Sequence, residues 1–112
     1  MNTNTIRLGV LGSTNGTDLQ SILDAIALGE LNADVSVVLS NRKKAYILER
    51  AKNHSVPAFF ISHKGKTREK FDSEMTTVLK SHNVGLVFLV GFMRILSAGF
   101  CREWRDKLLN VH

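Results

Sequence analysis

The chain has 112 residues, the size of one domain, and its 44% hydrophobic content and single proline exclude a disordered or linker-rich protein. The net charge of +5 is spread over separate basic segments, which argues against a nucleic-acid partner and favours a small anionic substrate. No apolar run reaches the roughly 20 residues of a membrane span, the first residues do not resemble a signal peptide, and a lone cysteine cannot form an internal disulfide. We therefore expect a cytoplasmic protein with no membrane partner.

Short apolar runs and helical stripes alternate along the chain. The first run, 6–12, meets small polar residues, as the end of a buried strand does. The next stretch places Leu19, Ile22, Leu23 and Ile26 at i, i+3, i+4 and i+7, which is one face of a helix. In chain order these criteria predict strand 6–12, helix 17–29, strand 34–40, helix 44–53, strand 57–62, helix 67–82, strand 85–91, a helix within 97–106 and strand 107–112.

This alternation predicts the fold. Strands joined by helices through short connections indicate an α/β protein with a Rossmann-like, open, mostly parallel sheet and helices on both faces, in a single domain over residues 1–112. Ligands of such sheets bind at the carboxyl ends of the strands. Three stretches are expected there: the loop after the first strand, the loop after the strand at 85–91, and the end of the last strand.

The stretch GSTNGTDLQ, residues 12–20, leads from the first strand into a helix through a small polar loop. Free N–H groups at a helix N-terminus suit a phosphate, Gly16 lets the backbone approach closely, and Thr17 can add a hydroxyl donor. The alternative interpretation is a simple helix cap, since Ser, Thr, Asn and Asp are the usual capping residues. The dinucleotide fingerprint and the Walker A lysine are both missing, which leaves a phosphorylated small molecule as the expected ligand.

Two further stretches follow the strands nearest the carboxyl end of the chain. GFMRIL, residues 91–96, is rich in large apolar side chains and could line a pocket for a flat organic ligand or simply cover the sheet edge. Asn110 and His112 are two residues apart on a predicted strand, so their side chains are expected on the same face. An amide that stabilises an oxyanion beside an imidazole that transfers a proton is suited to acyl chemistry.

Other polar side chains are interpreted as structural. His54, His63 and His82 fall in predicted loops or helix ends and are expected to be solvated. Cys101 is expected to pack within the last helix rather than to act as a nucleophile. Because no Cys/His cluster has zinc spacing, the sequence predicts no metal site.

Taken together, these stretches resemble the phosphoribosylglycinamide formyltransferase family, folate-dependent enzymes of purine synthesis. The resemblance runs along the whole chain: GSTNGTDLQ resembles the family's phosphate loop, and TREKFDSEM the segment with its folate-contacting arginine. The most specific stretches are LVGFMRILSAGF, residues 89–100, and LLNVH, residues 108–112. The resemblance implies the formyltransferase fold, 10-formyltetrahydrofolate as formyl donor, glycinamide ribonucleotide as acceptor, and no metal.

The resemblance also implies roles for particular residues. The expected phosphate-binding residues are Gly16, Thr17 and Asp18. The expected folate contacts are Arg68, Met93, Arg94, Ile95, Leu96 and Asn110. Asn110 would also be the catalytic amide and His112 the catalytic proton donor.

Several points separate the chain from the family's pattern. Asp18 stands where many relatives have asparagine, and Thr14 replaces a common glycine. The resemblance covers only the amino-terminal half of the family's length, and the other half carries a catalytic aspartate, so we expect residues 1–112 alone to be inactive. The oligomeric state is expected to be monomer or homodimer. The alternatives are another formyl-transfer enzyme, such as methionyl-tRNA formyltransferase or formyltetrahydrofolate hydrolase, and a non-catalytic phosphate-binding Rossmann-like module.

Overall fold

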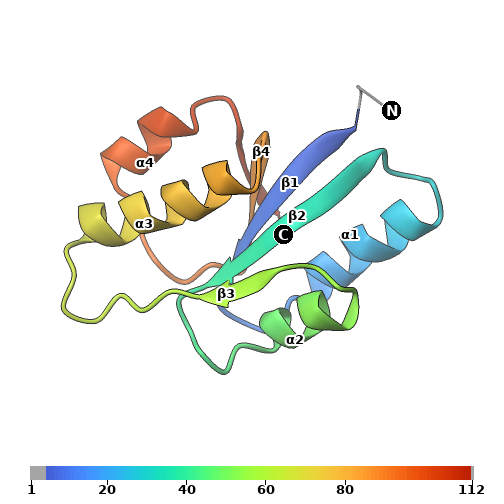
Figure 1. The fold of residues 1–112 in the computed structure, drawn as a ribbon, viewed down its shortest axis with the longest axis horizontal. Coiled ribbons are helices and arrows are strands. Elements are labelled where there is room, and N and C mark those ends of the chain that lie inside the picture. Colours follow the sequence, from blue (N-terminus) through green and yellow to red (C-terminus); the bar gives the residue numbers. More distant parts are fainter. Residues whose placement is uncertain (1–4, 112) are drawn as a thin grey trace.

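The computed structural model describes residues 5–111, so His112 lies outside the described residues. Its centre is a five-stranded sheet in the order β3-β2-β1-β4-β5, with every neighbouring pair parallel (Figure 1). This confirms the predicted open, parallel α/β architecture. The strands are β1 (Ile6–Gly12), β2 (Ala33–Ser40), β3 (Ala58–Phe60), β4 (Leu86–Val90) and β5 (Leu108–Val111).

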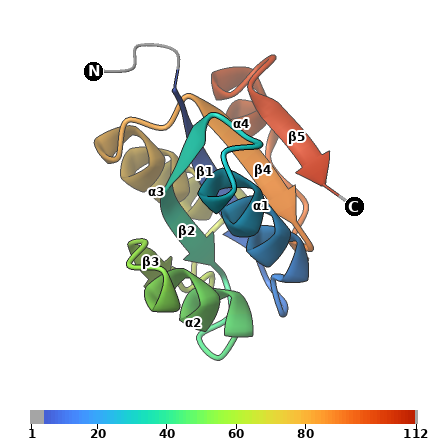
Figure 2. The ribbon, with the colours of Figure 1, turned by 90° about the vertical axis from the view of Figure 1, so that its right-hand side faces the viewer.

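Helices cover both faces of the sheet, as predicted. Figures 1 and 2 show α1 and α2 on one face and α3 and α4 on the other. Parallel strands need a long crossover connection, which is usually a helix. In this chain one helix lies between each pair of consecutive strands. The helices are α1 (Thr17–Ala27), α2 (Tyr46–Asn53), α3 (Arg68–Ser81) and α4 (Ala98–Glu103).

The core consists of two apolar layers, one on each face. Along β2, Val38 belongs to the layer under α1 and α2, whereas Val37 and Leu39 belong to the layer under α3 and α4. This alternation is the two-residue period of a strand, and it explains why the interior strands read as continuous apolar runs. The layer under α3 and α4 includes the fully buried Phe71 and Met75 of α3.

The last predicted strand, 107–112, is an edge strand. β5 lies at one edge of the sheet and, within residues 5–111, pairs only with β4 (Figure 2). Leu109 is 51% exposed and Asn110 is also exposed. The sequence could not predict this edge position, because a short edge strand and a short interior strand can have the same pattern of apolar residues.

The environments of three residues differ from their predictions: Cys101 was expected to be packed, and His63 and His82 were expected to be solvated. Cys101 is exposed, because it follows the buried Phe100 by one position and therefore faces away from the sheet. His63 is half-buried and meets the Phe71 ring edge-on, and the half-buried His82 ring lies against an aromatic side chain of β3. Of the three histidines within residues 5–111, His54 alone is exposed, as expected.

None of the helices within residues 5–111 is both long and apolar enough to cross a membrane.

The buried layer under α3 makes a stability prediction. Met75→Ala is expected to lower the free energy of unfolding by about 2–5 kcal/mol, because it leaves a cavity beneath a helix. Thr77→Ala is the matched control: its side chain lies on the exposed face of α3, and its hydroxyl donates only to the Ser73 carbonyl. Urea unfolding should find the control within about 0.5 kcal/mol of the unmodified protein. Equal losses for the two variants would contradict the assigned packing.

Candidate active site at the carboxyl edge of the sheet

The loop that joins β1 to α1 begins the candidate site. Gly16 is the N-cap of α1, with φ of +71° in the left-handed region, and it provides no capping side chain. The first helical hydrogen bond runs from the Gln20 N–H to the Gly16 carbonyl, so the N–H groups of residues 17–19 precede the helical ladder. The side-chain cap considered as an alternative is therefore not formed. Thr17 is exposed, and the half-buried Asp18 lies in the first turn, where a carboxylate is compatible with the helix dipole.

The same loop is held from α2. The Thr14 carbonyl accepts from the Ile47 N–H at 3.1 Å, and the Asn15 carbonyl accepts from Arg50 Nε at 2.6 Å. Gly16 lies so close to α2 that a Cβ at this position would stand 2.4 Å from Ile47 Cγ1. Glycine is thus required here both for its positive φ and for its close approach.

The segment Gly91–Ser97, hereafter the β4–α4 loop, lies next to it. The Ser13 N–H donates to the Gly91 carbonyl at 3.2 Å, and the Met93 N–H donates to Ser13 Oγ at 2.8 Å. Ser13 Oγ in turn donates to Asn41 Oδ1, which follows the end of β2, at 2.5 Å. One buried hydroxyl therefore joins the carboxyl ends of β1, β2 and β4.

The side chains of the β4–α4 loop divide into two sets. Phe92 and Leu96 pack against the layer under α3 and α4, whereas Met93 is 62% and Ile95 is 73% exposed. The first set covers the sheet, which is one of the two interpretations of this stretch. The second set leaves apolar surface exposed at the edge where ligands bind in such sheets, and the pocket for a flat ligand stays a prediction.

Arg94 takes a third position within the loop. Its guanidinium lies 4.9 Å from the centre of the Phe71 ring, a cation–π distance, and its Nε is buried without a hydrogen-bond partner. At the end of the loop the Ser97 N–H donates to Asp72 Oδ2 at 2.6 Å. The first turns of α3 therefore hold the second half of the loop.

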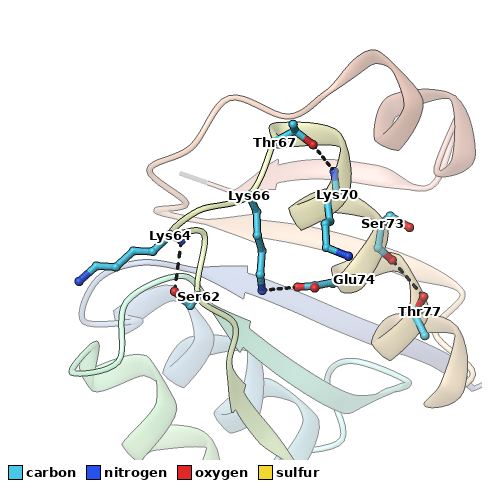
Figure 3. Close-up of polar contacts among 8 residues, drawn as sticks. All are labelled: Ser62, Lys64, Lys66, Thr67, Lys70, Ser73, Glu74 and Thr77. Atoms are coloured by element: carbon cyan, nitrogen blue, oxygen red, sulfur yellow. Dashed lines mark hydrogen bonds and ion pairs between the residues drawn. The ribbon is translucent and has the colours of Figure 1, made fainter.

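Arg68 opens α3 and is exposed. Figure 3 shows how the preceding connection is fixed: Thr67 Oγ1 accepts from the Lys70 N–H at 3.1 Å, and Lys66 Nζ pairs with the Glu74 carboxylate at 2.6 Å. The hydroxyl caps the helix, a contact typically worth about 1 kcal/mol. The β4–α4 loop contacts Phe71 and Asp72 of the same helix, so α3 fixes the positions of both Arg68 and that loop.

Asn110 lies opposite Leu89 in the register of β4 and β5, close to the start of the β4–α4 loop. Leu108 packs in the layer under α3 and α4, and Asn110, two residues further on, faces the same side. The prediction that His112 shares this face concerns a residue outside the described part of the chain. Within residues 5–111, no group of three His, Cys, Asp or Glu side chains is close enough to hold a metal ion.

The charge at this edge is basic. Arg42, Lys43 and Lys44, which follow β2, are exposed, as are Lys64 and Arg68 near the start of α3. Such a surface attracts anionic ligands. The structure thus brings the predicted phosphate and folate residues and Asn110 to one edge.

The sequence reading did not single out Ser13, Asn41 or Asp72. All three are nine-tenths or more buried and bond to a neighbouring loop. The available signal was position: Ser13 and Asn41 each come directly after a strand that ends at the ligand-binding edge. Nothing local in the sequence of α3 distinguished Asp72 from the other two acidic residues of this helix, Glu69 and Glu74.

Gly16 provides a prediction with an internal control. Gly16→Ala is expected to lower the free energy of unfolding by about 2 kcal/mol or more, because a methyl group would both strain the left-handed backbone and collide with Ile47. Gly29→Ala has the same backbone penalty, with φ of +76°, but a Cβ there has nothing within 4 Å. Thermal denaturation of the two variants separates collision from backbone strain. A Gly29→Ala loss as large as that of Gly16→Ala would contradict the close contact.

Comparison with known proteins assigns the family. The model of the family described as formyl transferase matches residues 6–112. The trifunctional purine biosynthetic protein adenosine-3 of Drosophila melanogaster is 44% identical over 109 residues, which are 95% of this chain and 8% of that protein. The phosphoribosylglycinamide formyltransferase of Haemophilus influenzae is 36% identical over 107 residues, 95% of this chain and 50% of that protein.

The fold agrees with the sequence comparison. The crystal structure of glycinamide ribonucleotide transformylase 1 from Symbiobacterium toebii has a TM-score of 0.94 and 37% identity, over 99% of this chain and 53% of that one. The chain thus spans about half the length of these bacterial relatives. With the parallel sheet, the matched sequence and the matched fold in agreement, the chain belongs to the formyl transferase family.

Proposed function

We propose that residues 1–112 form the amino-terminal half of a phosphoribosylglycinamide formyltransferase, which transfers a formyl group from 10-formyltetrahydrofolate to the amine of glycinamide ribonucleotide in purine biosynthesis. The observation that carries the proposal is the hydrogen bonding of the β4–α4 loop to Ser13, at the start of the β1–α1 loop. The proposed phosphate site and the proposed site for a flat ligand would thereby be adjacent, as a transfer between two substrates requires. The activities for which the related proteins are named support this choice of substrates.

The phosphate of the ribonucleotide would lie at the start of α1. Free N–H groups of residues 17–19 and the Thr17 hydroxyl would donate to its oxygens, with Gly16 allowing close approach. Asp18 is the unfavourable element, since its carboxylate would repel a phosphate. In the proposed complex Asp18 contributes its backbone N–H, and its side chain turns away from the anion.

The folate would lie against the β4–α4 loop. Met93 and Ile95 offer exposed apolar side chains to a flat ring. In the proposed complex the backbone groups of Arg94 and Leu96 would form hydrogen bonds with that ring. Arg68, exposed at the start of α3, would pair with a carboxylate of the folate tail. The stacked position of Arg94 on Phe71 favours a backbone contact over a side-chain contact for that residue.

The reaction would proceed by addition and elimination. The amine nitrogen attacks the formyl carbon, and the carbonyl oxygen becomes an oxyanion in a tetrahedral intermediate. Asn110 and protonated His112 would each donate a hydrogen bond to that oxygen, and His112 would then pass its proton to the leaving folate nitrogen. The intermediate then collapses: the bond from carbon to the folate nitrogen breaks, that nitrogen gains a proton, and the attacking amine loses one. The residues present require no metal in this scheme.

The substrate assignment predicts the outcome of one assay. The full-length protein that carries this segment is expected to convert glycinamide ribonucleotide and 10-formyltetrahydrofolate to the formylated ribonucleotide and tetrahydrofolate, followed by mass spectrometry. Methionyl-tRNA and water are the competing formyl acceptors. Formate as the main product would favour a hydrolase, and formylation of the tRNA would favour the other transferase. Binding of the ribonucleotide without any effect of folate would indicate a non-catalytic module.

The proposed catalytic roles of Asn110 and His112 predict that replacing either residue lowers the turnover rate. In the full-length protein, Asn110→Ala is expected to lower kcat by about 100-fold, because one donor to the oxyanion is removed. His112→Ala is expected to lower turnover by at least about 100-fold, the low end for an acid–base group. Asn53→Ala, at an exposed amide at the end of α2, is the control and should leave kcat unchanged. A kcat for Asn110→Ala equal to that of the control would reject the role of Asn110.

The proposed enzyme would act in the cytoplasm on small molecules, without a nucleic-acid or membrane partner, as a monomer or homodimer.

A further inference from the structure

We propose that Ser13 and Asn41 are positioning residues, which hold the β4–α4 loop in the conformation that binds the folate. Neither residue needs to touch a substrate. The inference rests on the proposed function for the identity of the ligand, but the positioning itself rests on contacts within the protein. Its consequence is that a residue beside the phosphate site sets the affinity of the folate site.

The chemistry of the three groups fixes the direction of each hydrogen bond. The Met93 N–H can only donate, so Ser13 Oγ must accept from it, at 2.8 Å. The hydroxyl hydrogen of Ser13 is then free to donate to Asn41 Oδ1, at 2.5 Å. Each group in the chain fills the hydrogen-bonding need of the next, and loss of the hydroxyl leaves both the Met93 N–H and the Asn41 oxygen without this partner.

Burial makes these bonds effective. Ser13 is 3% and Asn41 is 7% exposed, so water does not compete for either side chain. Hydrogen bonds shielded in this way are strong, and a buried group that loses its partner is costly. The link therefore acts as a fixed connection between the ends of β1, β2 and β4 and not as an exchangeable surface contact.

The tip of the β4–α4 loop has few other restraints. Met93 and Ile95 are largely exposed, so their side chains do not fix the backbone by packing. The later part of the loop is held separately, through the ring of Phe71 beneath Arg94 and through Asp72 at Ser97. The Ser13 hydroxyl is thus the side-chain contact that places the Met93 backbone.

The effect of Ser13 can be measured in two ways in the full-length protein. Ser13→Ala removes both hydrogen bonds, so amide exchange across residues 91–96, followed by mass spectrometry, is expected to accelerate at least about tenfold. The KM for 10-formyltetrahydrofolate is expected to rise about tenfold, while the KM for glycinamide ribonucleotide changes by less than about twofold. A general loss of structure would instead raise the KM values for both substrates by similar factors.

Asn41→Ala provides a second variant. It removes one bond only, since the Ser13 hydroxyl can still accept from Met93, and a smaller rise in loop exchange is expected. Added to Ser13→Ala, it should have no further effect on exchange of residues 91–96, because the two residues act through one connection. Additive effects of the two substitutions would contradict the connection.

Ser36→Ala is the matched control. Ser36 is also a buried serine of the sheet, 8% exposed, but its hydroxyl has no hydrogen-bond partner. It lines a cavity of about 590 Å³ at the opposite edge of the sheet, together with residues such as Arg7 and Asp34. This control should leave loop exchange and both KM values unchanged.

The outcomes separate the two proposals. Loop exchange and folate KM in Ser13→Ala equal to those in Ser36→Ala would overturn the positioning role. An equal rise in both KM values would also overturn it. If the unmodified protein transferred no formyl group while Ser13→Ala still accelerated exchange of residues 91–96, the proposed function would fail and the positioning role would stand.

Discussion

The site depends on how the backbone that leaves β4 satisfies its hydrogen bonds. A loop at the end of a parallel strand has lost its sheet partners, and its buried polar groups must find others. In this chain they are found on both sides: Ser13 binds the Gly91 carbonyl and the Met93 N–H, and Asp72 binds the Ser97 N–H. The β4–α4 loop thereby becomes a bridge between the first strand and the third helix, and the proposed folate site is placed relative to both.

A second constraint acts at the start of α1. The loop from Ser13 to Gly16 is pressed against α2, where a side chain at position 16 would meet Ile47. Glycine at this N-cap leaves the first N–H groups of the helix uncapped by any side chain, and an anion is the natural partner for such groups. Gly16 therefore has two effects. It allows the loop to pack tightly against Ile47 of α2, and it leaves the first N–H groups of α1 without a side-chain cap.

Much of this arrangement could be predicted from the sequence, because parallel α/β folds have a strong pattern. The alternation of apolar runs and helical stripes indicated the sheet, and the rule that ligands bind at carboxyl strand ends brought the three candidate stretches to one edge. The family was recognised through the same stretches. The boundaries changed mainly where caps decide them, as at Thr67, which precedes α3 as its N-cap instead of belonging to it.

The other features could not be predicted without the three-dimensional structure. The exposure of β5 depends on the order of the strands in the sheet, which the pattern of apolar residues does not specify. The bond from Ser13 to Asn41 joins residues far apart in the chain, and Ser13 accepts from Met93 only because β1 and β4 are neighbours in a definite register. Short-range patterns carry no information on such contacts, so the residues that position the site were the ones missed.

The most direct test of the account is the footprint of each substrate on amide exchange in the full-length protein. Glycinamide ribonucleotide alone should protect residues 12–20, and an unreactive folate analogue alone should protect residues 91–97, because the two ligands occupy adjacent loops at the carboxyl edge. Protection by either ligand around Arg7 and Ser36, at the opposite edge, with no change in these loops would contradict the account.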